Sequence, residues 1–246
     1  KIREPFIIDV KVRRVSLMIA DFERRKAKYI PVATALYALY GHPTWRQSLP
    51  PLDELVDCIL SQSTSDTNKD RAFAALKRHY PSWEAVMDAP VEEVIEVIRP
   101  GGLAQQKAPR IQEVLRTIYA ERGELKIDFL NDLPLDEAKA WLTSHNGVGP
   151  KTAAIVLCFA FNRPAFPVDT HIHRVGQRIG FLPANISADK AHPIMERIVP
   201  PEDHYTFHLN LIRLGREICG ARRPLCEICP LTAHCDYYQS MTYGQP

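Results

Sequence analysis

The residues best suited to chemistry are four cysteines near the C-terminus, Cys219, Cys226, Cys229 and Cys235. They follow the pattern C-x6-C-x2-C-x5-C and fall within seventeen residues. Thiols gathered this closely are typical of a metal centre. Structural zinc sites with four thiolates usually combine two separated C-x2-C pairs, whereas compact runs of four cysteines also hold iron–sulfur clusters. From the residues alone, both kinds of centre stay open.

A second segment, residues 142–157, has the pattern of two helices joined by a tight turn. Gly147-Val148-Gly149 supplies the turn, and Pro150 takes the first position of the second helix, where its missing N–H costs little. Glycines permit unusual backbone angles and close approach, and free N–H groups at a helix start bind phosphate. Such a hairpin would grip a DNA backbone without reading its sequence.

Lys151 lies in the first turn of that second helix. The positive end of the helix dipole disfavours a cation there, and we expect partial burial to add to this effect. Both influences favour the neutral, nucleophilic form of the amine. A lysine in this place could equally extend to solvent or pair with phosphate, so Lys151 by itself does not establish a nucleophile.

Two motifs together resemble the endonuclease III family of helix-hairpin-helix DNA glycosylases. They are G-V-G-P-K-T-A at 147–153 and P-V-D-T-H at 167–171. In that family the lysine attacks C1′ of the damaged nucleoside and the aspartate assists, which implies catalytic roles for Lys151 and Asp169. The two residues lie eighteen positions apart, as the family motif requires. Asp169 also fits the N-cap of the helix that follows, and a capping aspartate is preorganised.

The resemblance extends to the cysteines, whose spacing is similar to the cluster loop of the family and implies a [4Fe–4S] cluster as cofactor. In that family the loop contacts DNA phosphate, so Arg216, Arg222 and Arg223 are expected to form a basic patch. Binding to DNA needs such a local patch because the formal net charge of the whole chain is only +2. Cys58 and Cys158 fall on apolar helix faces and are interpreted as buried side chains.

Two more segments resemble the parts of the family that enter DNA when a nucleotide is flipped out. Residues 59–66 match L-S-x-x-x-x-D, in which a polar side chain fills the gap; Gln62 is the candidate and Ser63 the alternative. Residues 102–108 match G-L-x-x-x-K-A, with Leu103 as the apolar wedge. Gln62 could instead bond locally, and Leu103 could belong to the core.

The resemblance covers residues 30–238 and departs from the family at two places. His145-Asn146 stands where the family usually has Leu-Pro, which we expect to alter the packing of the hairpin or a pocket wall. Residues 1–28 precede the usual start of the family, and their role stays open. Within them, residues 6–15 fit either a short strand or a helix.

The elements that must position these residues are helical almost throughout. Apolar residues repeat at three- and four-residue spacing, and prolines and glycines fall where helices of roughly 10–15 residues would end. The pattern predicts an all-α protein.

The resemblance implies two helical domains, a barrel with the helix-hairpin-helix and an iron–sulfur cluster domain, with the DNA cleft between them. The predicted segments are an extension (1–28), an N-terminal helix packing on the cluster domain (29–50), the barrel (51–163) with the hairpin at about 137–161, the cluster domain (164–238) and a tail (239–246).

The function implied by the resemblance is that of a bifunctional DNA glycosylase and AP lyase of base excision repair. Such an enzyme removes oxidised pyrimidines from duplex DNA and cleaves the abasic site by β-elimination through a lysine Schiff base. We expect a monomer that acts on damaged duplex DNA. No apolar run reaches membrane-spanning length, and we expect a cytoplasmic location, associated with the nucleoid in a prokaryote.

Two alternative functions remain. An adenine-mismatch glycosylase shares the fold and the cluster but uses a carboxylate without the lysine, and Asp57 lies near where that acid would fall. The presence of Lys151 counts against it, as do the eleven residues after Cys235, which leave no room for a mismatch-sensing domain. The other alternative is a non-catalytic DNA-binding module with a structural four-cysteine zinc site. The sequence does not set the lesion specificity.

Overall fold

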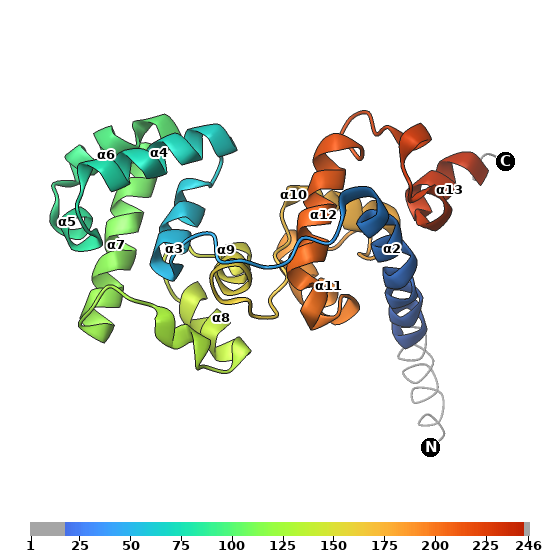
Figure 1. The fold of residues 1–246 in the computed structure, drawn as a ribbon, viewed down its shortest axis with the longest axis horizontal. Helices are drawn as coiled ribbons and strands as arrows, with labels where there is room; N and C mark the ends of the chain where they lie inside the picture. Colours follow the sequence, from blue (N-terminus) through green and yellow to red (C-terminus); the bar gives the residue numbers. More distant parts are fainter. Residues whose placement is uncertain (1–17, 244–246) are drawn as a thin grey trace, which may run out of the picture. The chain divides into compact units, whose positions relative to one another are not determined.

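The computed structural model describes residues 18–243, and these residues form helices and loops without a strand among them. The prediction of an all-α fold is therefore confirmed. The chain divides into two compact units (Figure 1): residues 45–167 form one, and the other combines the segment up to Thr44 with the segment from Val168 onward. The segment 6–15, expected as a strand or a helix, lies outside the described residues. Among the helices of the described part, none has both the length and the apolar character needed to cross a membrane.

The unit of residues 45–167 is built around α3 (Pro51–Leu60), a helix in which every residue is buried. A proline at its first position starts the helix without losing a hydrogen bond. Ser65 and Ser82 start the next two helices, because each side-chain oxygen accepts a backbone N–H of the first turn. The other helices of this unit are α4 (Asp66–His79), α5 (Trp83–Asp88), α6 (Val91–Ile98), α7 (Ala104–Arg122), α8 (Leu135–Thr143) and α9 (Pro150–Ile155), with 3₁₀ turns at Arg99–Gly101 and Asp128–Asn131 and a π-helical continuation of α9 at Val156–Ala160.

Carboxylates are buried on α3 together with its apolar residues, and two of them have cationic partners. Asp53 accepts the indole N–H of Trp83 at 2.7 Å and pairs with Lys77 at 3.1 Å. Asp57 pairs with Lys69 at 2.8 Å. A buried carboxylate needs such partners because its desolvation is otherwise costly.

Glu54, the third buried carboxylate of α3, accepts a hydrogen bond from Ser48 Oγ at 3.3 Å. Burial, followed by the negative charge of Asp57, raises the pKa of Glu54 to about 7. In an unfolded chain a glutamate loses its proton near a pKa of about 4.3. The folded protein therefore holds one more proton than the unfolded chain in the intervening pH range.

This difference predicts a pH-dependent stability that Glu54→Gln removes. Because the folded state binds the extra proton, the stabilising contribution is complete at acidic pH and is lost as pH rises toward 7. Above pH 7 the Gln variant should exceed the wild type in free energy of unfolding by about 1–3 kcal/mol. Urea unfolding at pH 5 and pH 8 measures this, with the exposed Glu84→Gln as control. An unchanged pH dependence in Glu54→Gln would contradict the assignment.

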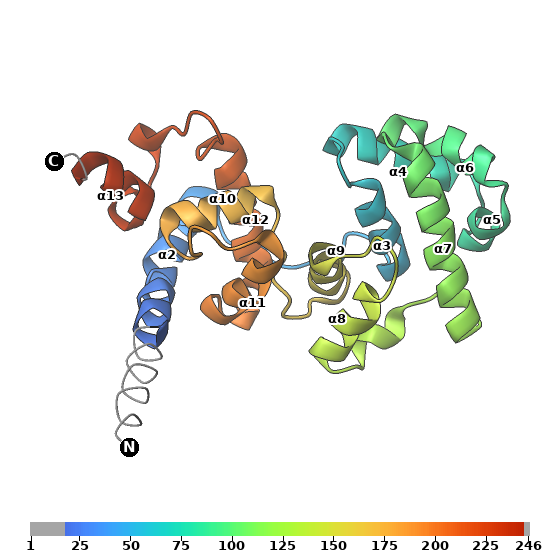
Figure 2. The same cartoon turned by 180° about the vertical axis from the view of Figure 1, so that it is seen from behind.

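The second unit packs α10 (Thr170–Ile179) against α12 (His204–Glu217), as Figure 2 shows from behind. Helix α2 (Tyr29–Tyr40) packs on α12 as well, where the rings of Tyr29 and Phe207 meet edge to face with centroids 5.2 Å apart. The remaining elements are a helix over residues 18–27, α11 (Ala188–Ile198), α13 (Asp236–Tyr243) and 3₁₀ turns at Pro201–Asp203, Cys226–Ile228 and Thr232–His234.

Two segments lie differently from the sequence-based expectation. Residues 45–50 belong with the helices that follow them, because the indole N–H of Trp45 donates to the carbonyl of Phe159 at 3.1 Å. Residues 239–243, expected as part of a tail, complete α13, because their backbone continues the helix that begins at Asp236.

Candidate active site and cysteine pocket

The turn of the predicted hairpin lies between α8 and α9, which pack against each other. Gly147 has a φ of +81°, and a Cβ built on it would lie 2.0 Å from Cδ of Arg110. Gly149 has a φ of −93° and open space around a built Cβ. Val148 is buried, and its N–H donates to the carbonyl of His145 at 3.1 Å. Of the two glycines, only Gly147 therefore needs the conformational freedom of glycine, although the sequence pattern predicted this need for both.

His145 and Asn146, at which the sequence departs from the family pattern, pack beneath the hairpin turn. The His145 ring is buried and meets Trp141 edge to face, with centroids 4.4 Å apart. Burial lowers the pKa of His145, which favours the neutral ring. Asn146 donates to the carboxylate of Glu113 on α7 at 3.1 Å. The pair thus fixes the end of α8 by an aromatic contact and a side-chain hydrogen bond.

Lys151 is the second residue of α9, in the first helical turn, and its side chain is exposed. The expected partial burial is wrong, because the buried face of α9 consists of its next residues, Thr152 to Ala154. The exposed position leaves the amine accessible from solvent. The residue itself lies in the first turn of α9, where backbone N–H groups suit an anionic ligand.

Asp169 belongs to the other unit, where it is the N-cap of α10. Its Oδ1 accepts the N–H of Ile172 at 2.7 Å, and its carbonyl accepts the N–H of His173 at 2.8 Å. The first bond fixes the orientation of the carboxylate, and the second begins the helix. Each of the two catalytic candidates, Lys151 and Asp169, is thus positioned by the start of a helix.

The two candidates for the residue that fills the gap in DNA lie in different surroundings. Gln62 donates from Nε2 to the carbonyl of Gly147 at 2.9 Å and accepts from Nη1 of Arg110 at 3.1 Å. Ser63 is exposed and has a φ of +53°. Gln62 therefore ties the turn after α3 to the hairpin, and Ser63 is the exposed residue of that turn.

The candidate wedge, Leu103, is 48% exposed and has a φ of +50°, so it lies at a turn and not in the core. The ammonium of Lys107 lies behind this turn and is only 1% exposed. It donates to the carbonyls of Leu60 and Gly101 at 2.7 and 2.9 Å. One buried cation therefore joins the turn after α3 to the turn before α7, a role that the motif alone does not reveal.

The four cysteines Cys219, Cys226, Cys229 and Cys235 line a single pocket of about 310 Å³. Burial raises the pKa of the last three, and the neighbouring thiols raise it further. Four thiols around one pocket are a donor set that a cationic centre would stabilise. Among residues 18–243, no three or more His, Cys, Asp or Glu side chains converge as the ligands of one metal ion. A [4Fe–4S] cluster takes one thiolate on each iron, so its four cysteines need not converge on a single ion.

Arg178, near the end of α10, is a residue of this pocket that the sequence analysis missed. Its Nη1 donates to Sγ of Cys219 at 3.3 Å and to the carbonyl of Gly220 at 2.7 Å. Its guanidinium lies over the ring of Tyr237, 4.9 Å from the centroid. Cys219 is forty-one residues away in the sequence, so no local spacing signals the contact. The three arginines expected to form a basic patch, Arg216, Arg222 and Arg223, are exposed.

The comparison with known families now identifies the class of protein. A family model described as "HhH-GPD superfamily base excision DNA repair protein" matches residues 56–201. The chain belongs to this superfamily, and within it the chain is similar to endonuclease III, which confirms the resemblance seen in the sequence.

The relatives include endonuclease III of Thermotoga maritima, 30% identical over 203 residues that cover 82% of this chain and 91% of that protein. Endonuclease III of Bacillus subtilis is 34% identical over 185 residues, with coverage of 75% and 80%. The Arabidopsis thaliana protein At3g47830, provisionally named a DNA glycosylase, is 38% identical over 170 residues. That match covers 69% of this chain but only 57% of the Arabidopsis protein.

Solved structures give the same picture of the fold. A non-covalent endonuclease III–DNA complex superimposes with a TM-score of 0.74 at 27% identity, covering 89% of this chain and 98% of that one. A trapped endonuclease III–DNA covalent intermediate, an estranged-adenine complex, gives a TM-score of 0.73 at 28% identity with the same coverage.

The different surroundings of the two hairpin glycines predict different costs for adding a methyl group. Gly147→Ala should lower the free energy of unfolding by about 1–2 kcal/mol from the left-handed backbone alone, with a further loss from the collision with Arg110. Gly149→Ala, the matched control, should change it by less than about 0.5 kcal/mol. Chemical denaturation of both variants tests this, and equal losses would show that the two positions are equivalent.

Proposed function

We propose that this chain is a bifunctional DNA glycosylase and AP lyase that removes oxidised pyrimidines from duplex DNA. The observation that carries the proposal is the exposed amine of Lys151 in the first turn of the hairpin helix. The turn before it has the left-handed Gly147 that a phosphate-binding hairpin needs. The similarity to endonuclease III, whose covalent complex with DNA has been trapped, supports the same conclusion.

The reaction follows from the residues in four steps. The hairpin binds phosphates on one strand, and the target nucleotide leaves the stack. The unprotonated amine of Lys151 attacks C1′. The base departs with the electron pair of the glycosidic bond and takes up the proton that the new C1′–N bond releases. Asp169 stabilises the positive charge that develops on the sugar, as carboxylates do in glycosidases. Ring opening gives a Schiff base; loss of a C2′ proton then expels the 3′-phosphate, which cleaves the strand.

The four cysteines would hold a [4Fe–4S] cluster, for which four thiols around one pocket are a suitable donor set. Bound there, the cluster would hold its loop in shape and not take part in bond breaking. The exposed Arg216, Arg222 and Arg223 would then contact phosphates. A monomer in the cytoplasm, associated with the nucleoid in a prokaryote, is part of the same proposal.

The alternatives differ in their use of lysine. A mismatch glycosylase would depend on Asp57, but this carboxylate is paired with Lys69 inside the unit. A non-catalytic DNA-binding module would have no lysine adduct at all. Borohydride trapping on DNA together with iron and zinc analysis of the purified protein separates the three functions.

The first prediction from this proposal concerns the covalent adduct. Reduction with borohydride during the reaction on abasic-site DNA should trap the wild type, and Lys151→Ala should reduce the adduct to background because the amine is gone. Lys126→Ala, which removes an exposed lysine of the same unit, should trap like the wild type. Undiminished trapping by Lys151→Ala, or none by the wild type, would exclude the lyase mechanism.

The second prediction concerns the charge of Asp169. Asparagine is an equally good N-cap, so Asp169→Asn should retain the melting temperature of the wild type. The same change removes the carboxylate charge from the site, and base release should slow by roughly 100-fold. Single-turnover kinetics and thermal unfolding measure the two effects; a normal rate would limit Asp169 to capping.

A further inference from the structure

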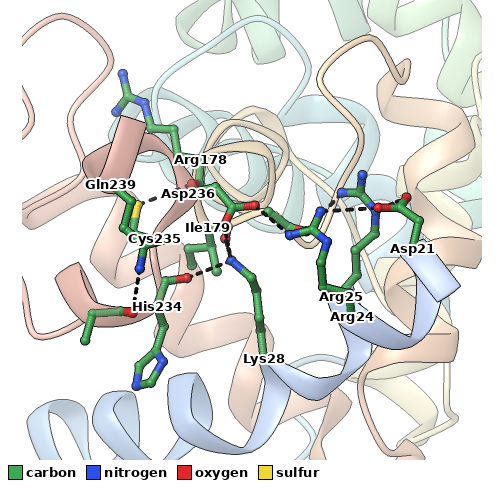
Figure 3. A network of polar contacts seen from close by, with 12 residues as sticks. Asp21, Arg24, Arg25, Lys28, Arg178, Ile179, His234, Cys235, Asp236 and Gln239 are labelled. Carbon is green, nitrogen blue, oxygen red and sulfur yellow. Dashed lines mark hydrogen bonds and ion pairs between the residues drawn. The ribbon is translucent and has the colours of Figure 1, made fainter. Parts of the chain in front are cut away.

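The helix over residues 18–27 and the lysine that follows it have no role in the proposed chemistry. Figure 3 shows the ammonium of Lys28 among acceptors from two distant segments. It donates to the carbonyl of Ile179 at 2.7 Å, to the carbonyl of His234 at 3.0 Å and to the carboxylate of Asp236. The last two acceptors stand directly before and directly after Cys235. Lys28 therefore bonds a backbone carbonyl on one side of the fourth cysteine and a side-chain carboxylate on the other.

Two arginines one turn earlier reinforce this contact. Arg24 pairs with Asp236 at 3.2 Å, and Arg25 donates to the carbonyl of Gly180 at 2.9 Å. Asp21 orients both guanidinium groups, at 3.2 and 2.8 Å. The carbonyls at the end of α10 form the negative end of its dipole, where a cation is stabilising. The charges on the N-terminal helix are thus complementary to the surface on which they lie.

Gly180, whose carbonyl accepts the hydrogen bond from Arg25, has no side chain that could displace the neighbouring carboxylate. Gly180 ends α10 with a φ of +98°, and a Cβ built on it would lie 2.0 Å from Oδ2 of Asp236. Any side chain at this position would push the carboxylate away from Lys28. Gly180 therefore ends α10 in the left-handed conformation and also leaves the space that the carboxylate of Asp236 occupies.

Cys235 is also held from the side of α10, because its Sγ donates to the carbonyl of Arg178 at 3.2 Å (Figure 3). The thiol contacts α10, while the carbonyl of His234 and the carboxylate of Asp236 contact Lys28, whose side chain is only 15% exposed. Cys235 is the last of the four cysteines and the residue before α13. Binding of the thiolate to a metal centre would remove the proton of the first contact. The second contact, supplied by a segment more than two hundred residues earlier, would remain.

We propose that residues 21–28 form a latch that holds Cys235 in the cysteine pocket and sets how firmly the pocket retains its metal centre. The second half rests on the proposed iron–sulfur cluster. The first half does not, because it concerns the position of the thiol. Lys28, Arg24 and Arg25 are positioning residues that act through Asp236 and the end of α10.

The test uses the full chain and Lys28→Met, which keeps the length and apolar stem of the side chain and removes its charge. The exposed Lys26→Met on the same helix is the matched control. Iron release to an excess of chelator, followed by the fading of visible absorbance, should be about tenfold faster in Lys28→Met, because charge-assisted hydrogen bonds are lost. Lys26→Met should release iron at the wild-type rate. Equal rates in all three proteins would overturn the role in metal retention.

A second readout separates the latch from the cluster. In metal-depleted protein, alkylation of Cys235 by iodoacetamide, located by mass spectrometry, should be about tenfold faster in Lys28→Met than in the wild type. Wild-type reactivity in that variant would overturn the latch, whether or not the protein binds iron. If the purified wild type contained no iron, the proposed cluster would fail, and the alkylation result would still decide the latch.

Milder variants keep the proposal testable if Lys28→Met does not fold. Asp236→Asn leaves the two carbonyl contacts of Lys28 in place and should show a smaller effect in the same direction. Lys28→Arg retains the charge and should restore part of the slow alkylation. An Asp236→Asn protein that reacts like the wild type, together with a Lys28→Arg protein that gains nothing over Lys28→Met, would contradict the role of charge.

Discussion

The unit with the four-cysteine pocket depends on α10, a helix of ten residues that serves a different function at each end. Asp169 fixes the start through its bond to Ile172, and such a cap stabilises a helix by about 1 kcal/mol. Arg178, the last residue but one, bonds the thiol of Cys219, and Lys28 bonds the carbonyl of Ile179, the last residue. A shift of α10 along its axis would therefore move the candidate catalytic carboxylate and the cysteine pocket together. Under the proposed function, this coupling gives the cluster a structural role, since the proposed lysine chemistry does not use it.

The unit of residues 45–167 positions its groups by burying charges together with their partners. Lys107 joins two turns through carbonyl oxygens alone, and the buried carboxylates of α3 pair with cations or retain a proton. Arg110 lies against Gly147 and bonds Gln62, so the hairpin and the turn after α3 rest on one guanidinium. The turns proposed to meet DNA are thus held from behind by side chains of α7, and their exposed residues remain available for a ligand.

The sequence predicted those features whose signal is local. The all-α fold, the hairpin and the helix that Asp169 starts all followed from spacing within short segments. The contacts of Arg178, Lys107 and Lys28 could not be predicted, because their partners lie forty-one, forty-seven and up to 208 residues away. The burial of Lys151 was misjudged for a related reason: which face of α9 packs inward depends on the other helices, not on the residues beside the lysine.

Three lysines show why geometry, rather than pKa, selects the candidate nucleophile. Burial lowers the pKa of Lys107, and a lowered pKa is the usual mark of a reactive amine. However, Lys107 is 1% exposed and needs its protons to bond two carbonyls, so attack on a substrate would destroy the turns it supports. Lys28 is engaged by a carboxylate and two carbonyls in the same way. Lys151 is exposed in the first turn of α9, where backbone N–H groups suit an anionic ligand, so of these three lysines it is the one that a ligand from solution can reach.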